Sequence, residues 1–183
     1  MRKGFTVVEI LVVVGVLTVT SVIFVEIFFR SLRGGNQAQT LGVIKQNGQQ
    51  AIELMDKNIR LADNVVCIGS IGSGADNTLV IEKEKNYTRF RFISPTSSKN
   101  GYISQDNVDN CTAPSPAGSL IILTNTNPVG GVSVLSGSFQ KDTQAGFKDV
   151  ILINFTIGPG VGVPKSLTDN IDPLEFTTSV ELR

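Results

Sequence analysis

The residues with the clearest potential for chemistry lie at the start of the chain. Two basic side chains, Arg2 and Lys3, and a glycine, Gly4, precede an almost wholly apolar run, Phe5–Phe29, and an acid, Glu9, lies near the start of that run. As a helix, the run would be roughly 37 Å long, more than the ~30 Å hydrocarbon core of a bilayer. A carboxylate is unfavourable in hydrocarbon, so Glu9 requires a partner.

Three interpretations of the apolar run compete. A cleaved secretory signal peptide would have a shorter apolar region followed by a small-residue cleavage site, which this sequence lacks. An ordinary membrane anchor leaves Glu9 unexplained. Basic residues flank the run on both sides, so their distribution does not fix its orientation. The third interpretation supplies a partner for the carboxylate.

The segment Arg2–Glu9 resembles the leader of type IV prepilins. In that family a short basic leader ends in glycine, and cleavage directly after it leaves an N-terminal phenylalanine that is usually N-methylated. A glutamate is the fifth residue of the mature chain. Gly4, Phe5 and Glu9 match this pattern position for position. The resemblance implies cleavage between Gly4 and Phe5 by a prepilin peptidase and N-methylation of Phe5.

Cleavage would also create a charge partner for Glu9. The new α-amine of Phe5 has an ordinary pKa near 8 and would be largely protonated at neutral pH. In a filament, Glu9 of one subunit can neutralise the Phe5 amine of its neighbour, which removes two uncompensated charges from a low-dielectric bundle. We therefore expect an intersubunit charge pair between Glu9 and Phe5.

The second acid of the run, Glu26, has a partner within the same helix. It lies roughly 26 Å beyond Glu9 along a helix axis, and Arg30 follows four residues later, in the favourable order for a helical ion pair. A second intersubunit contact is the alternative. Many major pilins carry a helix-bending proline at the depth of Glu26, but the first proline here is Pro95, so the kink of those helices is not expected.

Helical periodicity continues beyond the apolar run. The glycine pair Gly34–Gly35 predicts a flexible point. Apolar or small residues then recur at steps of three and four on one face: Leu41, Ile44, Gly48, Ala51, Met55, Ile59 and Ala62. The opposite face is polar: Gln39, Lys45, Gln46, Gln49, Glu53 and Lys57. This pattern predicts an amphipathic half-helix that packs on a sheet.

From residue 64 onward the pattern changes to strands separated by turn residues. The candidate strands are Val65–Ile68, Thr78–Glu82, Thr88–Ile93, Leu120–Thr124, Val132–Phe139, Val150–Thr156 and Leu174–Leu182. The predicted fold class is α+β, with a long N-terminal helix packed on an antiparallel, β-rich head, as in pilins. The predicted parts are a leader (1–4), a transmembrane helix (5–29), an amphipathic half-helix (30–63) and the head (64–183).

A second resemblance narrows the family. The helix end Gln50–Ala62 and the closing segment Phe176–Arg183 are similar to those of J-type minor pseudopilins and PilW-like minor pilins. Subunits of that group lie at or near the filament tip and help to start assembly. The resemblance implies a minor subunit, and a major subunit with an unusual head is the alternative.

Composition narrows the function classes. Acidic and basic residues balance at 16 each, which disfavours nucleic acid as a partner, although a basic strip through Arg89, Arg91 and Lys99 would favour DNA. No histidine is present, so the commonest general base and zinc ligand are missing.

If the head lies outside the cytoplasm, Cys67 and Cys111 are expected to form a disulfide. Two free buried thiols are the alternative.

Two further segments carry weak motifs. Asp106–Asn110 has oxygen ligands at spacings that calcium could use but lacks the glycine and glutamate of an EF-hand loop. Gly69–Gly74 is rich in glycine but has no Walker lysine. Both are interpreted as turns, and no catalytic residue, metal or cofactor is expected.

The sequence therefore predicts a non-enzymatic structural subunit of a type IV pilus or a type II secretion pseudopilus. The expected partners are other pilin or pseudopilin subunits, the prepilin peptidase and methyltransferase, and an inner-membrane assembly platform. Before assembly the chain would cross the cytoplasmic membrane once, with its head outside the cytoplasm. Afterwards it would lie in a surface or periplasmic filament. A head that acts as an adhesion or DNA-uptake module is the alternative function.

Overall fold

A computed structural model describes residues 4, 6–69, 76–143, 146, 148–164 and 171–182 of the chain. It contains one long helix, α1 (Val7–Arg60), followed by antiparallel strands, which confirms the predicted α+β class. The strands are β1 Asn64–Gly69, β2 Thr78–Lys83, β3 Asn86–Ile93, β4 Tyr102–Asp106, β5 Ile121–Ile122, β6 Val132–Asp142, β7 Val150–Pro159 and β8 Leu174–Glu181. The chain divides into two compact units, Met1–Gln39 and Thr40–Arg183.

The glycine pair predicted as a flexible point does not interrupt α1. Gly34 and Gly35 both have helical conformation, and the helix continues to Arg60. Glycine weakens a helix by about 1 kcal/mol relative to alanine, but it keeps the backbone N–H that proline lacks. The backbone hydrogen-bond ladder can therefore pass through the pair.

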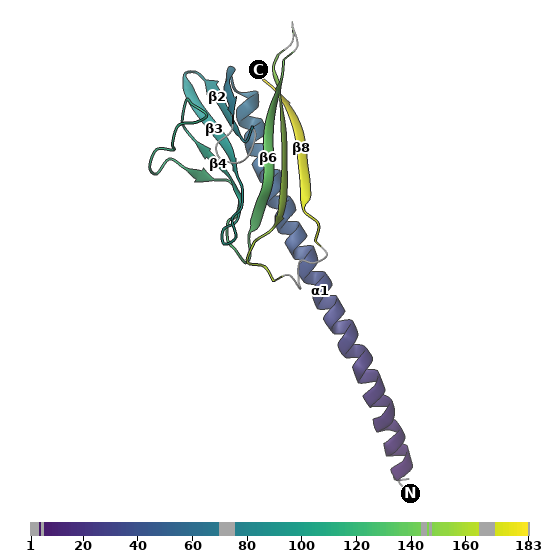
Figure 1. Ribbon diagram of the computed structural model, residues 1–183. Coiled ribbons are helices and arrows are strands. Elements are labelled where there is room, and N and C mark those ends of the chain that lie inside the picture. The colour runs from purple at the N-terminus through teal and green to yellow at the C-terminus, as the bar shows by residue number, and fades with distance from the viewer. Residues whose placement is uncertain are drawn as a thin grey trace. The chain divides into compact units, whose positions relative to one another are not determined.

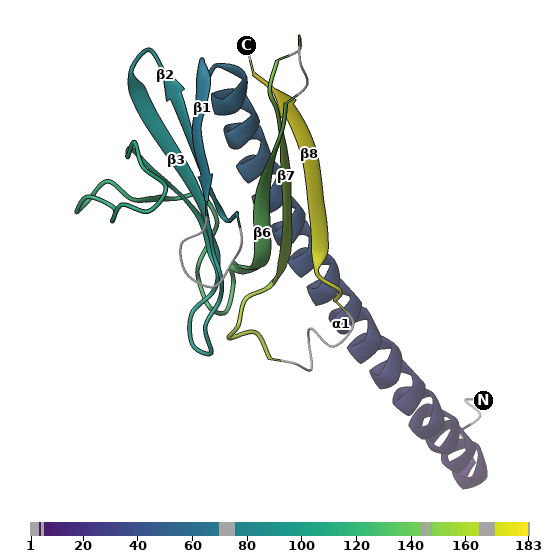
Figure 2. The same ribbon diagram turned by 45° about the horizontal axis from the view of Figure 1, so that its top comes forward.

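The C-terminal part of α1 is amphipathic, as predicted. Its core-facing residues are buried: Ile44, Gly48, Ala51, Met55 and Ile59. All of the polar residues assigned to the opposite face are exposed. Figures 1 and 2 show both sheets of the head against this part of the helix, which supplies one wall of the core.

The first sheet has the strand order β1-β2-β3-β4-β5, with every neighbouring pair antiparallel. One face carries the core residues Leu79, Ile81, Phe90, Phe92 and Ile103. The β2–β3 hairpin turns through Glu84 and Lys85, both with positive φ, as tight two-residue hairpins require.

Strand β4 was absent from the sequence prediction. Its residues Ile103 and Ser104 are both buried although they point to opposite faces of the sheet, and Asp106 is buried as well. With polar side chains buried on one face, the strand lacks the alternation that identifies a half-buried strand. Strand β5 is also shorter than the predicted Leu120–Thr124.

The second sheet has the order β6-β7-β8 and is also antiparallel. Its central strand β7 alternates, with Ile151, Ile153, Phe155 and Ile157 buried in the core. Strand β6 contacts strands of the first sheet, and Figure 2 shows it between β1 and β7. The two sheets and the helix thus enclose one core.

A series of phenylalanine rings connects the sheets with the helix. Phe92 of the first sheet stacks on Phe139 with centroids 4.6 Å apart and lies 5.5 Å from Phe155. Phe155 in turn stacks on Phe176 at 5.2 Å. Phe176 closes against Gly48 of α1, where an added Cβ would lie 2.2 Å from the ring. Glycine at this position allows β8 to approach the helix.

Replacing Gly48 with alanine should therefore destabilise the head. The methyl group would displace the Phe176 ring, and overpacking of this kind typically costs about 1–3 kcal/mol. Urea unfolding of the Gly48→Ala chain should show a lower midpoint. Gly42→Ala is the matched control because it lies in the same helix with nothing within 4 Å of the added Cβ, and it should leave stability unchanged or raise it. Equal midpoints for the two variants would contradict this packing.

Candidate functional site

The N-terminal unit exposes an apolar helix surface. Val7 is 78% exposed and Phe24 is 71% exposed, and the other large apolar residues of the segment are exposed as well. The helix is long and apolar enough to cross a membrane. An apolar surface of this extent needs lipid or other apolar helices to cover it.

The two polar side chains at the start of the helix bond reciprocally to the backbone. The Glu9 amide donates to Thr6 Oγ1 at 3.3 Å, and the Thr6 amide donates to Glu9 Oε2 at 3.5 Å. This is the capping-box arrangement, in which a threonine at the N-cap and a glutamate three residues later satisfy two amides that have no partner in the helix. A threonine followed three residues later by a glutamate is the sequence signature of a capping box. The sequence analysis did not use it and gave Thr6 no role.

The capping box fixes where the Glu9 carboxylate lies. It is held at the first turn of α1, where the helix dipole favours negative charge. Among the described residues, Oε2 accepts the Thr6 amide and Oε1 has no partner. Gly4 is exposed. Phe5, with its predicted cleavage, methylation and pairing with Glu9, lies outside the described residues, as do Arg2 and Lys3 of the leader.

The second acid of the apolar helix has its partner in the same chain. Arg30 Nη2 lies 2.5 Å from Glu26 Oε1, and both side chains are largely exposed. The predicted ion pair between them is confirmed. Glu26 thus has a neutralising cation one turn away, whereas the bonds of Glu9 in the described chain are to backbone and hydroxyl groups.

In the head, a buried ion pair joins β3 to β4. Arg89 and Asp106 are opposite each other across the two strands, and both side chains are almost fully buried. The guanidinium donates from Nε to Asp106 Oδ1 at 2.8 Å and from Nη2 to Oδ2 at 2.6 Å. This parallel pairing is the strong geometry for a charge-assisted contact.

A second arginine and a serine complete the cluster. Arg91 Nη2 lies 3.2 Å from Asp106 Oδ2 and also donates to Ser115 Oγ, and the Ser115 hydroxyl donates to Asp106 Oδ2 at 2.6 Å. Burial acts to raise the pKa of the Asp106 carboxyl, but hydrogen bonds from Arg89 and Ser115 and the charges of both arginines hold this pKa below its ordinary value. Burial, together with the charge of Arg89, lowers the pKa of the Arg91 guanidinium. Two cations thus share one carboxylate.

The cluster also holds the connection 107–120 between β4 and β5. Arg89 Nη1 donates to the carbonyl oxygens of Asn110 and Ala113, at 2.8 and 2.6 Å. The same connection is joined to β1 by the disulfide between Cys67 and Cys111, whose Cα atoms are 6.2 Å apart. The connection is therefore fixed to two strands of the first sheet.

These contacts bear on two alternatives that the sequence left open. Arg89, Arg91 and Lys99 do not form an exposed basic strip, because the Arg89 side chain is fully buried and the Arg91 side chain is only 12% exposed. Asp106, which the sequence analysis placed in a turn, is the last residue of β4, and its carboxylate is bonded to Arg89, Arg91 and Ser115 rather than open to a calcium ion. The sequence analysis could not foresee this, because the charged residues of β3 and β4 have the same pattern whether that face of the sheet is buried or exposed.

Removing the disulfide should destabilise the head substantially. The two cysteines are 44 residues apart, and closing a loop of that size in the unfolded chain corresponds to roughly 4 kcal/mol in the chain-entropy model. The double variant Cys67→Ala/Cys111→Ala should unfold at lower urea concentration than the oxidised parent. The parent treated with a thiol reductant should match the variant. Identical curves for the oxidised parent and the variant would show that the bond contributes nothing.

Among the described residues, no three acidic or cysteine side chains gather in a way that could hold a metal ion. Most of the glycine-rich segment Gly69–Gly74 lies outside the described residues. Comparison of the chain with protein-family models, with curated proteins and with solved structures finds no match. Its function must therefore be argued from its own residues.

Proposed function

We propose that this chain is a structural subunit of a filament of the type IV pilus or type II secretion class. The observation that carries the proposal is the position of Glu9, a carboxylate in the first turn of an exposed apolar helix with one oxygen free among the described residues. Gly4 lies immediately before Phe5, where the apolar run begins. The resemblance to prepilins implies that the chain is cleaved directly after Gly4.

Burial of the apolar helix supports assembly with other helices. Before assembly, lipid covers the exposed surface of the N-terminal unit, and in the filament the same surface packs against the helices of neighbouring subunits. Lipid and helix interiors are similarly apolar, so apolar contact alone gives little preference for one axial offset. A charge pair at a single position does give that preference.

The Glu9 carboxylate and the Phe5 amine supply this pair between neighbouring subunits. Each charge alone in a low-dielectric bundle is strongly unfavourable, whereas together they neutralise each other. Glu26 is less suited to this role because Arg30 already neutralises it. One offset between adjacent helices is therefore stabilised by the pair.

Within the filament, the chain is a minor subunit near the tip. The similarity of Gln50–Ala62 and Phe176–Arg183 to the corresponding segments of minor subunits supports this role. The partners are other subunits, the processing enzyme and the membrane assembly platform. The chemistry at Gly4 and Phe5 is carried out by these partners, and the chain itself acts through packing. The basic strip that would favour DNA as a partner is missing, because the Arg89 side chain is buried and the Arg91 side chain is only 12% exposed.

Fractionation of the native cells tests this function. In cells with an intact assembly machinery, an antibody against the head should detect the chain among filaments released by shearing, or by gentle membrane disruption if the filament is periplasmic. In cells that lack the assembly platform, the chain should remain entirely in the membrane fraction. If the distribution is the same in both strains, the chain is a membrane protein unrelated to the filament.

A further inference from the structure

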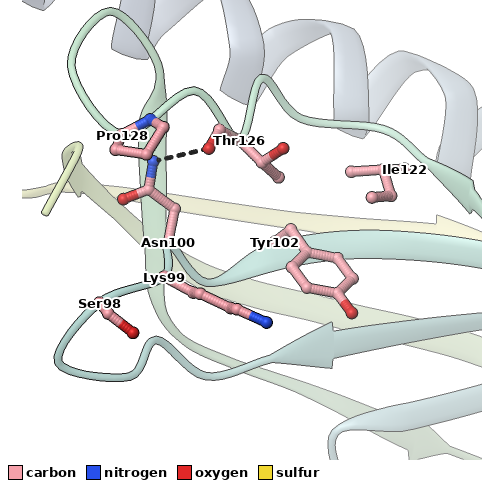
Figure 3. A pocket seen from close by; sticks show the side chains of 7 residues that line it. All are labelled: Ser98, Lys99, Asn100, Tyr102, Ile122, Thr126 and Pro128. Atoms are coloured by element: carbon pink, nitrogen blue, oxygen red, sulfur yellow. Dashed lines mark hydrogen bonds between the residues drawn. The ribbon is translucent and has the colours of Figure 1, made fainter. Parts of the chain in front are cut away.

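A cavity of about 270 Å³ lies at one end of the first sheet. Its walls come from β4, β5 and the two connections beside them, and include Lys99, Tyr102, Ile122 and Pro128 (Figure 3). Pockets for drug-sized ligands usually measure 300–1,000 Å³. The size of this cavity therefore suits a smaller molecule, of about one ring.

The cavity is preformed, because one buried side chain holds its walls together. Asn100 is 4% exposed. Its amide nitrogen donates to the carbonyl oxygens of Thr126 and Asn127, at 3.2 and 2.9 Å, and its oxygen accepts from the Val161 amide at 2.7 Å. Figure 3 shows the Asn100 side chain directed at Thr126. A ligand would meet walls that are already ordered, which lowers the entropy lost on binding.

Among the described residues that line the cavity, Lys99 carries the only charged group, and the other polar side chains are hydroxyls and one amide. In Figure 3 the side chains of Lys99 and Tyr102 extend in the same direction, and Ser98 lies on the same connection as Lys99. Neither the Lys99 ammonium nor the Tyr102 hydroxyl bonds to another described residue, and no acidic side chain is among the described residues that line the cavity. Lys99 is exposed to solvent, and an ammonium without a carboxylate partner at the edge of a cavity favours an anion there.

The strands beneath the cavity add further positive charge. Ser104 lies opposite Ile122 on β5 and opposite Arg91 on β3, and it is two residues from Tyr102 on the same face of β4. Arg91 and Arg89 share the single carboxylate of Asp106, which leaves one positive charge in excess. Arg91 Nε and Ser104 Oγ are buried without a hydrogen-bond partner. Arg91 thus places positive charge on the same face of the sheet as Tyr102, one strand away.

The remaining lining is apolar. Ile122, Pro128 and the ring of Tyr102 supply apolar surface at different points of the lining, with the Tyr102 ring between the other two. The negative face of the tyrosine ring also attracts the weakly positive C–H groups of a saturated ring. A ligand that satisfies both halves of the cavity has a compact ring and one anionic substituent.

We propose that this cavity binds the carboxylate of a one-ring organic anion, with Lys99 as the charge partner and the Tyr102 ring as the apolar platform. Two sources supply that chemistry: the uronic acid of a polysaccharide and a small cyclic carboxylic acid. The inference is independent of filament assembly, because it concerns a ligand of the head alone.

Tyrosine fluorescence of the full-length chain in detergent micelles can test the proposal. The chain has no tryptophan and two tyrosines, so Tyr87→Phe leaves Tyr102 as the sole tyrosine emitter. This background would be titrated with two pairs of probes that do not absorb at the tyrosine band: glucuronate against glucose, and cyclohexanecarboxylate against cyclohexylmethanol. At least one acid should saturate the signal and bind more tightly than its neutral counterpart, and the tighter acid identifies the source.

Substitution of the lysine completes the test. Lys99→Gln should weaken binding of that acid about fivefold, which corresponds to the loss of one partly exposed ion pair, and should leave the neutral probe unchanged. Lys45→Gln, at an exposed lysine on α1, is the matched control and should bind like the parent. The proposal is overturned if neither acid binds more tightly than its neutral counterpart, or if Lys99→Gln binds the acid as the parent does.

Discussion

Replacing Glu9 with glutamine is expected to reduce incorporation of the chain into filaments tenfold or more while its insertion in the membrane stays unchanged. Glutamine retains an oxygen that can accept the Thr6 amide, so the capping box can persist. Only the charge is lost. Leaving the ammonium of a neighbouring Phe5 without a counter-ion in a low-dielectric bundle costs about 3–5 kcal/mol, and each 1.4 kcal/mol is about tenfold in an equilibrium.

The matched control is Glu26→Gln, which removes the other acid of the apolar helix. Because Glu26 pairs with Arg30 of its own chain at an exposed position, its loss should leave incorporation near the parent level. The ratio of filament-bound to membrane-bound chain, measured by quantitative immunoblotting, gives the result. If Glu9→Gln assembles like the parent while Glu9→Val fails, Glu9 acts only as a helix cap and the charge pair is wrong.

Removing the shared carboxylate of the buried cluster should lower the stability of the head strongly. Asp106→Leu leaves the guanidinium groups of Arg89 and Arg91 buried together without a counter-ion, and breaking a buried pair in this way costs about 3–5 kcal/mol. Arg89→Met should destabilise the head less, because Arg91 and Ser115 still contact the carboxylate. Urea unfolding at neutral pH should rank the parent first, Arg89→Met second and Asp106→Leu last.

The surface ion pair between Arg60 and Asp56 provides the control. Arg60→Met should not change the midpoint measurably, because this pair is on the exposed side of α1. The double variant Arg89→Met/Asp106→Leu should recover part of the loss, since apolar replacement of both partners leaves fewer unpaired charges. A neutral effect of Asp106→Leu would contradict the assigned role of the cluster.

The same cluster sets the direction of the pH dependence. The pKa of Asp106 is lower in the folded chain than its ordinary value, so the carboxylate stabilises the head above the unfolded pKa of about 3.9. This contribution is lost as the pH falls through the lower folded pKa. The difference in stability between the parent and Asp106→Leu should therefore narrow in acid.

The sequence predicted the elements whose apolar patterns are regular. The amphipathic face from Leu41 to Ala62 and the strongly alternating strands were found because burial there follows a single period. Strand β4 was missed because both of its faces are buried and one of them carries charge and hydroxyl groups. Pairing of Arg89 with Asp106 depends on strand register, which no local pattern reveals.

The candidate sites depended on the sequence to different degrees. The processing and pairing roles of Gly4, Phe5 and Glu9 rest on one short motif and stay predictions, whereas the capping role of Thr6 could have been read from its spacing to Glu9. The ion pair of Glu26 and Arg30 follows from helical spacing alone. The cavity beside Lys99 and Tyr102 could not be predicted, because it forms only when connections distant in sequence are joined through Asn100.

The most direct test of the central claim is the mass of the chain recovered from native filaments. Intact mass spectrometry with sequencing of the N-terminus should find a chain that begins at Phe5 and carries one methyl group on its α-amine. That product would place the charged nitrogen four residues before Glu9, where a neighbouring subunit can use it. Recovery of a monomeric, functional protein that still carries Met1–Gly4 would contradict the account.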